Sequence, residues 1–182
     1  MGLDAPAVVV GCGGTTEEIG GQHARLVERS GAALRVYPQA DAARLYAALR
    51  DFPAAREDGH SHACGCRISV LPSQLAPLLV RVEEEAARRH VEAVMLSHVG
   101  NGIAWIFTSA TDTAVLPSLA EWLRATVRAA GGWTVFERVP ATLRDRIDPW
   151  DKEPPGLQLM RGIKQTLDPG GNLSPGRFVG GI

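Results

Sequence analysis

The stretch that decides the fold runs from Arg67 to Phe136 and reads RISVLPSQLAPLLVRVEEEAARRHVEAVMLSHVGNGIAWIFTSATDTAVLPSLAEWLRATVRAAGGWTVF. Short apolar segments bounded by glycine, proline or polar residues predict strands. Longer segments whose apolar residues lie three and four positions apart predict helices. The stretch therefore predicts strands over 67–71, 91–97, 103–108 and 133–136, and helices over 73–89 and 116–130.

This order of elements is βαββαβ. In the ferredoxin-like pattern, two split βαβ units bring four antiparallel strands together and place both helices on one face. A turn over His98–Gly102 joins the two strands in the middle of the stretch. The sequence therefore predicts an α+β fold with a ferredoxin-like antiparallel sheet and helices on one face.

The residues before this stretch predict a separate N-terminal lobe. Residues 56–65 are polar or small and show no period, which is typical of a surface loop. We therefore expect an N-terminal lobe over 1–58 and the ferredoxin-like region over 59–182.

The N-terminal lobe itself has the pattern βαβα. Thr15 or Thr16 suits the first position before a helix, because its hydroxyl accepts backbone N–H bonds, and Gly31 suits the end of that helix. A second helix is expected to close at Pro53. The lobe therefore predicts strands over 7–10 and 34–37 and helices over 15–31 and 41–51.

The residues after the stretch predict one more helix and an irregular tail. Leu157, Met160, Ile163 and Leu167 follow helical spacing after two prolines, and Asp168-Pro169 ends the pattern. The tail that follows is rich in glycine and proline, which favour turns. Few apolar residues remain there to form a core, so we expect the tail to lie on another surface.

Composition excludes several classes of function. The chain has 182 residues, 45% of them hydrophobic, and a formal net charge of -1. A balanced charge gives no electrostatic footprint for nucleic acid, so we expect none as a partner. The start lacks a basic region and an apolar run long enough to span a bilayer, and three cysteines are too few for a disulfide framework. We therefore expect a cytoplasmic protein without a membrane span.

Three stretches resemble one family. LMRGIKQTLDPGGNLSPGRF, from Leu159 to Phe178, resembles the end of FAD-linked oxidases of the vanillyl-alcohol oxidase superfamily, which commonly close with a helix, Asp-Pro, a short turn and Asn-Pro-Gly-Arg or Asn-Pro-Gly-Lys. RISVLPSQLAPLL, from Arg67 to Leu79, is similar to the strand and helix that open the family's cap domain, and SHVGNGIAW is similar to its central hairpin. The resemblance is to the C-terminal domain of the type found in the FAD-binding subunit of bacterial glycolate oxidase.

The resemblance implies a function and a cofactor. It implies the cap or substrate part of an FAD-dependent oxidoreductase that acts on 2-hydroxy acids. The Gly-rich domain that holds most of the FAD in this family has no counterpart in the sequence. We therefore expect a fragment or a split subunit whose partners are a small 2-hydroxy acid and a flavin-binding domain or other oxidase subunits.

His98 is the first candidate for the catalytic base. It ends an expected strand, and Gly100, Asn101 and Gly102 follow it in a turn where glycines allow a planar ring to approach the backbone. Relatives carry a fuller His-Ala-Gly-Asp-Gly-Asn-x-His motif that can bind a metal, but here Asn101 replaces the acid and Trp105 lies nearby without a second histidine. We therefore expect Gly100, Asn101 and Gly102 to contact the cofactor, and we expect no metal. The other interpretation of His98 is a hydrogen-bonded structural histidine.

The tail supplies the remaining candidates for cofactor binding, Asn172, Ser174 and Arg177. The Arg177 guanidinium offers a planar fork of donors to an anion, such as the flavin edge or a substrate carboxylate. Ser174 stands where the family usually has asparagine, so an amide contact to the flavin is lost or replaced by a shorter hydroxyl. Lys164 is a neighbour with two interpretations. In one it compensates for the contact that Ser174 loses, and in the other it is only a solvated charge.

Two further motifs have a structural and a functional interpretation. HSHACGC places His60, His62, Cys64 and Cys66 at alternate positions, which suggests zinc, but one strand cannot easily wrap an ion, so a structural loop is favoured. VVVGCGGTTEEIG has a strand, glycines and a helix start, as in a phosphate-binding turn, but lacks the third glycine. An ordinary turn is favoured there.

The alternative function is a non-catalytic ferredoxin-like module for binding or assembly, since such sheets serve many roles. An enzyme part is expected to become ordered with a flavin-binding partner, whereas a module is expected to be indifferent to flavin. The sequence does not determine which hydroxy acid is oxidised or which acceptor takes the electrons.

Overall fold

A computed structural model describes residues 6–31, 34–55, 63–151 and 154–182. The chain divides into two compact units, an N-terminal unit over Met1–Tyr46 and a C-terminal unit over Ala47–Ile182. The boundary expected near residue 58 falls outside the described residues.

The N-terminal unit contains helix α1, Thr16–Ser30, and the start of helix α2, Gln39–Ala55. Thr15 caps α1 as predicted, because its hydroxyl accepts from the Glu18 amide while the Glu18 carboxylate accepts from the Thr15 amide. Gly31 ends the helix in the left-handed region at φ 59°. Helix α2 continues two residues past Pro53, where the prediction had ended it.

The two strands predicted in this unit are wrong. Residues 7–10 and 34–37 have no strand structure, and their apolar side chains are exposed, with Val8 at 83% and Val36 at 66%. A strand is stable only when its backbone groups pair with a neighbouring strand. The described residues of this unit supply no such neighbour, so apolar composition alone does not make these segments strands.

The C-terminal unit confirms the βαββαβ order. Its elements begin with strand β1 and end with strand β4, and they lie within two residues of the predicted bounds at most of their ends. The bounds are β1 Ala63–Ser69, α3 Pro72–Arg88, β2 Glu92–His98, β3 Ile103–Ser109, α4 Leu116–Ala129 and β4 Trp133–Arg138.

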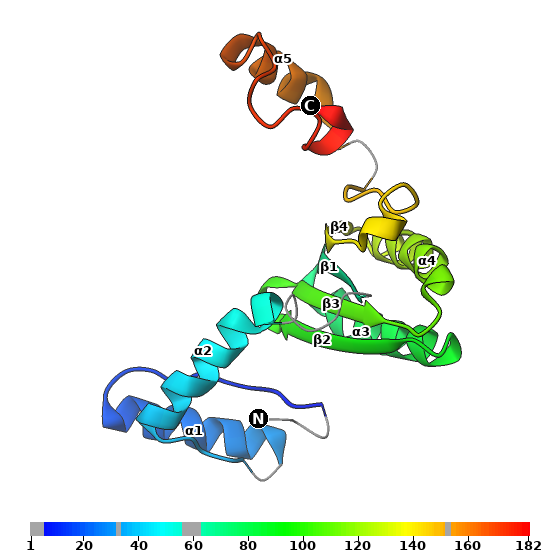
Figure 1. Ribbon diagram of the computed structural model, residues 1–182. Coiled ribbons are helices and arrows are strands. Elements are labelled where there is room, and N and C mark those ends of the chain that lie inside the picture. The colour runs from blue at the N-terminus through cyan, green and yellow to red at the C-terminus, as the bar shows by residue number, and fades with distance from the viewer. Residues whose placement is uncertain (1–5, 32–33, 56–62, 152–153) are drawn as a thin grey trace. The chain divides into compact units, whose positions relative to one another are not determined.

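The strands form one antiparallel sheet in the order β2-β3-β1-β4 (Figure 1). This is the order of a ferredoxin-like fold, in which the first strand of the motif lies between the third and the fourth, and the second strand lies at the edge beside the third. The hairpin β2–β3 closes at the turn after His98, where His98 lies opposite Ile103. The predicted α+β fold is therefore confirmed.

Helices α3 and α4 cover one face of the sheet (Figure 1). Alternate residues of the strands point into this core, where Ile68 and Ile106 from the strands and Leu75 from α3 are 1% exposed or less. Each such side chain contributes roughly 1.5–3 kcal/mol by leaving water. The remaining strand residues face the other way, on what we call the open face, and include Arg67, Leu96, His98, Trp105, Phe107 and Val135.

The loop predicted over 56–65 is wrong at its end, because β1 already begins at Ala63. Cys64 and Cys66 are 3% exposed and lie in the core, and Gly65 lies opposite Phe107 on the open face. A Cβ on Gly65 would lie 3.0 Å from the Phe107 ring. Gly65 therefore suits this position, because a larger residue would collide with the Phe107 ring.

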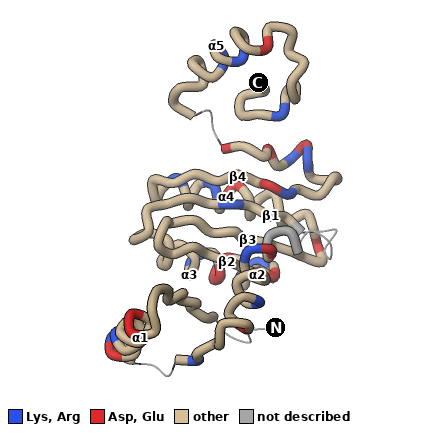
Figure 2. The backbone as a smooth tube through the Cα atoms, turned by 90° about the vertical axis from the view of Figure 1, so that its left-hand side faces the viewer, with Lys and Arg blue, Asp and Glu red and all other residues tan. Residues whose placement is uncertain are grey.

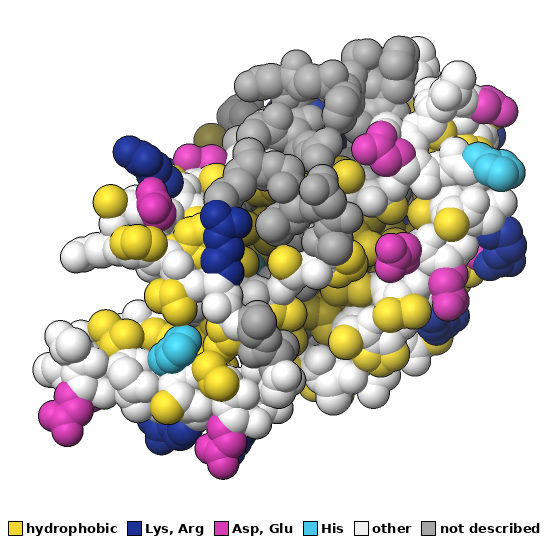
Figure 3. Space-filling model, turned by 90° about the horizontal axis from the view of Figure 1, so that it is seen from below, with side chains coloured by type: hydrophobic (Ala, Val, Ile, Leu, Met, Phe, Trp, Pro, Cys, Tyr) yellow, Lys and Arg dark blue, Asp and Glu magenta, His cyan; other side chains and the backbone are white. Residues whose placement is uncertain are grey.

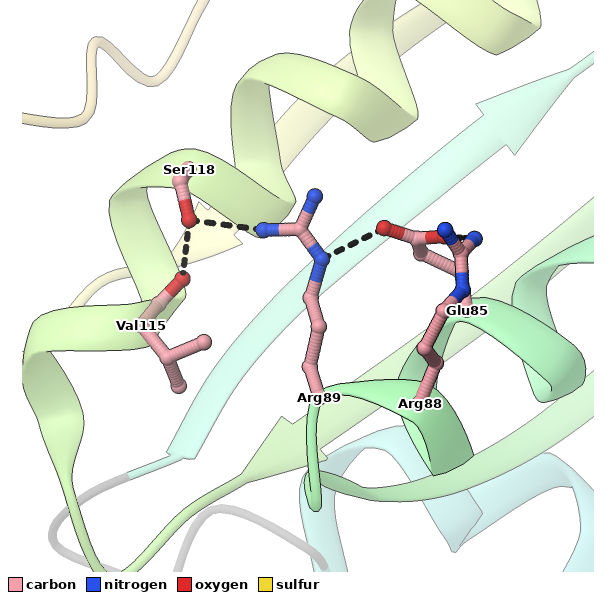
Figure 4. Close-up of polar contacts among 5 residues, drawn as sticks. All are labelled: Glu85, Arg88, Arg89, Val115 and Ser118. Carbon is pink, nitrogen blue, oxygen red and sulfur yellow. Dashed lines mark hydrogen bonds and ion pairs between the residues drawn. The ribbon is translucent and has the colours of Figure 1, made fainter.

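A buried carboxylate ties α3 to α4. Glu85 is 3% exposed and forms ion pairs with Arg88 and with Arg89, whose Nε lies 2.5 Å from Glu85 Oε1 (Figure 4). The same guanidinium donates to Ser118 Oγ at 2.7 Å, and Ser118 in turn donates to the carbonyl of Val115. The network therefore links the end of α3 to the start of α4.

The residues after β4 extend the edge of the sheet before the chain reaches helix α5, Leu157–Leu167. The Phe136 amide donates to the carbonyl of Pro149 at 2.7 Å, and Arg128 pairs with the buried Asp151. The position of α5 agrees with the helix predicted from Leu157 to Leu167.

Basic and acidic residues are both distributed along the chain (Figure 2). Exposed hydrophobic side chains lie among the charged ones (Figure 3). Among the helices that the structure describes, none combines the length and the apolar character needed to cross a membrane.

Candidate functional site

The predicted site residues fall into two groups. His98, Gly100, Asn101 and Gly102 occupy the turn between β2 and β3. Asn172, Ser174 and Arg177 lie in the tail after α5. Within the described ranges, the contacts made by the first group do not include the second. The structure therefore brings the residues of each group together but does not join the groups.

His98 stands at the end of β2, on the open face. Its ring meets that of Trp105 edge to face, with centroids 5.4 Å apart and an interplanar angle of 69°. Trp105 comes from the neighbouring strand β3 and is half-buried, while His98 is exposed. The indole therefore supports one side of the imidazole and leaves its other side accessible.

The turn after His98 is built from Asn101 and Gly102. Asn101 Oδ1 accepts from the Ile103 amide at 3.3 Å, and the Val70 amide donates to the Gly102 carbonyl at 2.9 Å. Gly102 has φ 72°, and a Cβ there would lie 1.9 Å from the Val70 carbonyl oxygen. Only glycine fits this contact, which holds the turn against the segment between β1 and α3.

Gly100 differs from Gly102 in its surroundings. It is exposed, and a Cβ added to it would meet nothing within 4 Å. The backbone at Gly100 is therefore accessible to a ligand, whereas Gly102 is committed to the packing of the turn.

The open face also carries a cation that the sequence prediction missed. Arg67 lies directly opposite Trp105 on β3 and Val135 on β4. Its Nε donates to Glu137 Oε1 at 2.8 Å. Arg67 was treated only as the start of a strand, and the period-two alternation of β1 and β3 is the signal that would have placed it beside Trp105.

Asp168 organises the tail. Its carboxylate accepts from the amides of Asn172 and Leu173, each at 2.9 Å, and pairs with Lys164 Nζ at 2.6 Å. These contacts lower the pKa of Asp168 to about 2. The hydrogen bond from Lys164 has the largest effect, and the hydrogen bonds from the two backbone amides add to it. Lys164 also donates to the Leu173 carbonyl at 2.6 Å, so it is a structural clamp and not a solvated charge.

Ser174 has a left-handed backbone, with φ 46°. Asparagine adopts this region more readily than serine, so Ser174 is held in a backbone conformation that its side chain does not favour. Arg177 follows in the same turn, since its amide donates to the Ser174 carbonyl at 3.2 Å. The Asn172, Ser174 and Arg177 side chains belong to exposed residues.

The tail is anchored through Trp150. The indole Nε1 donates to the Arg177 carbonyl at 3.2 Å, and the Trp150 and Phe178 rings meet edge to face with centroids 5.1 Å apart. This contact fixes the backbone of Arg177 and leaves its guanidinium exposed. Trp150 therefore supplies part of the surface on which the tail lies.

The two cysteines of HSHACGC lie in the core. Burial raises the pKa of the Cys64 thiol to about 11 and that of Cys66 further, so both stay protonated at neutral pH. His60 and His62 fall outside the described residues. In the described ranges, no three His, Cys, Asp or Glu side chains gather in a way that would hold a metal ion.

The Gly-rich turn before α1 is occupied by the protein itself. The Glu18 carboxylate accepts from the Thr15 amide and so lies at the positive end of the helix, where a phosphate would bind. Gly11 packs against Tyr46, because a Cβ there would lie 1.7 Å from the Tyr46 hydroxyl oxygen. The geometry therefore agrees with an ordinary turn.

The open face presents a defined set of chemical groups. An imidazole can accept a proton, a guanidinium can bind an anion, and aromatic rings can stack against a flat ligand. All of them lie on the sheet face opposite α3 and α4.

A known family matches almost the whole chain. The family is described as FAD linked oxidases, C-terminal domain, and the match covers residues 4–135 and 146–178. It includes the open face, the turn after His98 and the tail as far as Phe178. This chain therefore belongs to the family of FAD linked oxidases, C-terminal domain.

Proposed function

We propose that this chain is the substrate-side part of an FAD-dependent oxidoreductase that resembles glycolate oxidase and acts on 2-hydroxy acids. The observation that carries the proposal is the open face of a family-matched sheet, on which His98 and Trp105 are paired at 5.4 Å. The flavin belongs to a second domain or chain, which would close over this face. The partners would then be that flavin domain and a small 2-hydroxy acid.

Trp105 would be the main contact of the open face with a flat aromatic group. Trp105 and Phe107 lie two residues apart on β3 and point to the same side of the sheet; Trp105 is half-buried and offers part of its ring surface, whereas Phe107 is 9% exposed. Phe107 is also held edge to face by Phe52, with centroids 5.7 Å apart. The FAD would supply the acceptor for the hydride that leaves the substrate carbon.

His98 would take the hydroxyl proton of the substrate. The contact with Trp105 limits the orientations of its ring, so the imidazole is held in place before the substrate arrives. A base that is positioned in this way contributes about 10²- to 10⁴-fold to the rate.

The cofactor contacts would come from both groups of residues. Gly100 would let the ring system approach the backbone, with Asn101 and Gly102 fixing the turn beneath it. In the tail, Asn172, Ser174 and Arg177 would meet the flavin edge, and Arg177 is exposed and carries the positive charge. The Asp168 clamp would keep this part of the tail in shape.

The test is flavin reduction by 2-hydroxy acids in the assembly that contains this chain. We expect bleaching of the flavin absorbance on addition of glycolate or lactate, and a loss of at least 100-fold in the rate for His98→Gln. His23→Gln is the matched control, because His23 is an exposed histidine on α1. Equal rates for the two variants would reject His98 as the base, and a chain indifferent to FAD would favour the assembly module.

A further inference from the structure

Arg67 occupies an unusual position for a charged side chain. It lies in the middle of β1, a strand that has a partner on each side, and its side chain points to the open face. Its two cross-strand neighbours, Trp105 and Val135, are both largely buried, yet the Arg67 side chain keeps 38% of its exposure. A cation is therefore held on an aromatic and aliphatic surface.

Glu137 fixes one edge of the guanidinium. It accepts from Arg67 Nε at 2.8 Å, which uses one of the five N–H donors of the arginine. In the part of the chain that the structure describes, no other hydrogen bond of the Arg67 guanidinium occurs. The two terminal amino groups, which form the fork that binds carboxylates side by side, are therefore available.

The sheet register sets the distance between Arg67 and His98. Arg67 lies opposite Trp105, Trp105 lies opposite Leu96, and His98 follows Leu96 by two residues on the same face. Two strand spacings across and two residues along give about 12 Å between the two Cα atoms. The Trp105 side chain lies between them and contacts the His98 ring. A small molecule on Trp105 would have the cation on one side and the imidazole on the other.

We propose that Arg67 binds the carboxylate of the substrate, while Glu137 orients the guanidinium and Trp105 forms the floor between Arg67 and His98. This inference rests on the proposed function. The carboxylate would meet the two terminal amino groups of Arg67, and the hydroxyl at the neighbouring carbon would then point toward His98. Arg67 would thus select acids over alcohols of the same size.

The test compares substrates with and without a carboxylate in the flavin-loaded assembly that contains this chain. Glycolate is the acid, and 1,2-ethanediol is the matched alcohol. For Arg67→Met we expect KM for glycolate to rise by about 10- to 100-fold, which is the range for a hydrogen bond to a charged group, with the slow reaction of ethanediol unchanged. Arg67→Lys should recover part of the loss, because lysine keeps the charge without the fork.

Arg81→Met is the matched control, because Arg81 is an exposed arginine on α3, on the helix side of the sheet. Arg67→Met should fold normally, since exposed ion pairs contribute little to stability, and thermal unfolding of all variants checks this. Equal KM values for Arg67→Met and Arg81→Met would overturn the inference and leave the proposed function intact.

A second readout separates the two proposals when the wild-type flavin is not reduced by any 2-hydroxy acid. That result refutes the proposed function. Oxalate is then titrated into the same samples, and the NMR signal of the Trp105 indole N–H is followed. A saturable shift that is lost in Arg67→Met supports the carboxylate site, and a shift that is absent or unchanged in the variant overturns it.

Discussion

The Glu85 network provides a sharp test of how α3 and α4 are held together. Glu85→Ala removes a carboxylate that is 3% exposed and leaves Arg88 and Arg89 without their common partner. Arg88 is 72% exposed, so water replaces its contact at little cost, whereas Arg89 is 25% exposed and carries most of the effect. One hydrogen bond to a charged group contributes roughly 1.5–3 kcal/mol. We therefore expect a loss of about 2–3 kcal/mol in the free energy of unfolding.

Thermal unfolding followed by circular dichroism measures this loss. For a chain of this size the melting temperature should fall by roughly 4–12 °C. Glu84→Ala is the matched control, because Glu84 is the adjacent, exposed residue on the same helix, and its loss should stay within about 0.5 kcal/mol. If both variants melt at the same temperature, the network does not stabilise the helix pair and the reasoning is refuted.

Four other outcomes follow from local geometry. Gly102→Ala should lower the melting temperature by several degrees, because its Cβ would lie 1.9 Å from a backbone oxygen, whereas Gly100→Ala, with nothing within 4 Å, should leave it unchanged. The lowered pKa of Asp168, about 2 against an ordinary 3.8, means that its contribution to the tail is full above about pH 4 and is lost as the pH falls through 2. NMR shifts of the tail amides should titrate with a midpoint near 2, and a midpoint near 3.8 would contradict the clamp. Ser174→Asn should slow hydrogen exchange of the tail turn, because asparagine tolerates φ 46° better; faster exchange would contradict this. A thiol reagent should modify Cys12 alone in the native protein and all three cysteines after unfolding, because burial raises the pKa of the other two, and rapid native modification of more than one would refute this.

The C-terminal unit was largely predictable because its signals are local. Strand alternation and helical spacing are set by which side chains face the core, and β2, β3, α3 and α4 lie near their predicted bounds. Thr15 and Gly31 likewise mark the ends of α1, because capping depends on neighbouring backbone alone.

The N-terminal strands were not predictable from the same signals. Ala7–Val10 has the composition of a strand, but a strand also needs a partner, and the described residues of its unit supply none. Cys64 and Cys66 show the converse, because a segment that looked like a loop is buried where β3 and β4 provide partners on both sides. Pairing between distant segments decided both outcomes.

The candidate site was also predictable only where its signals are local in the sequence. Sequence alone identified His98 and its turn, because a histidine followed by glycines at a strand end is a local motif, and it indicated the family through the tail. Tertiary structure alone placed Trp105 against His98 and Arg67 opposite Trp105. It also made Asp168 the clamp of the tail. Sequence determines which chemical groups are present and how each strand alternates, whereas cross-strand register and loop closure decide which of those groups meet.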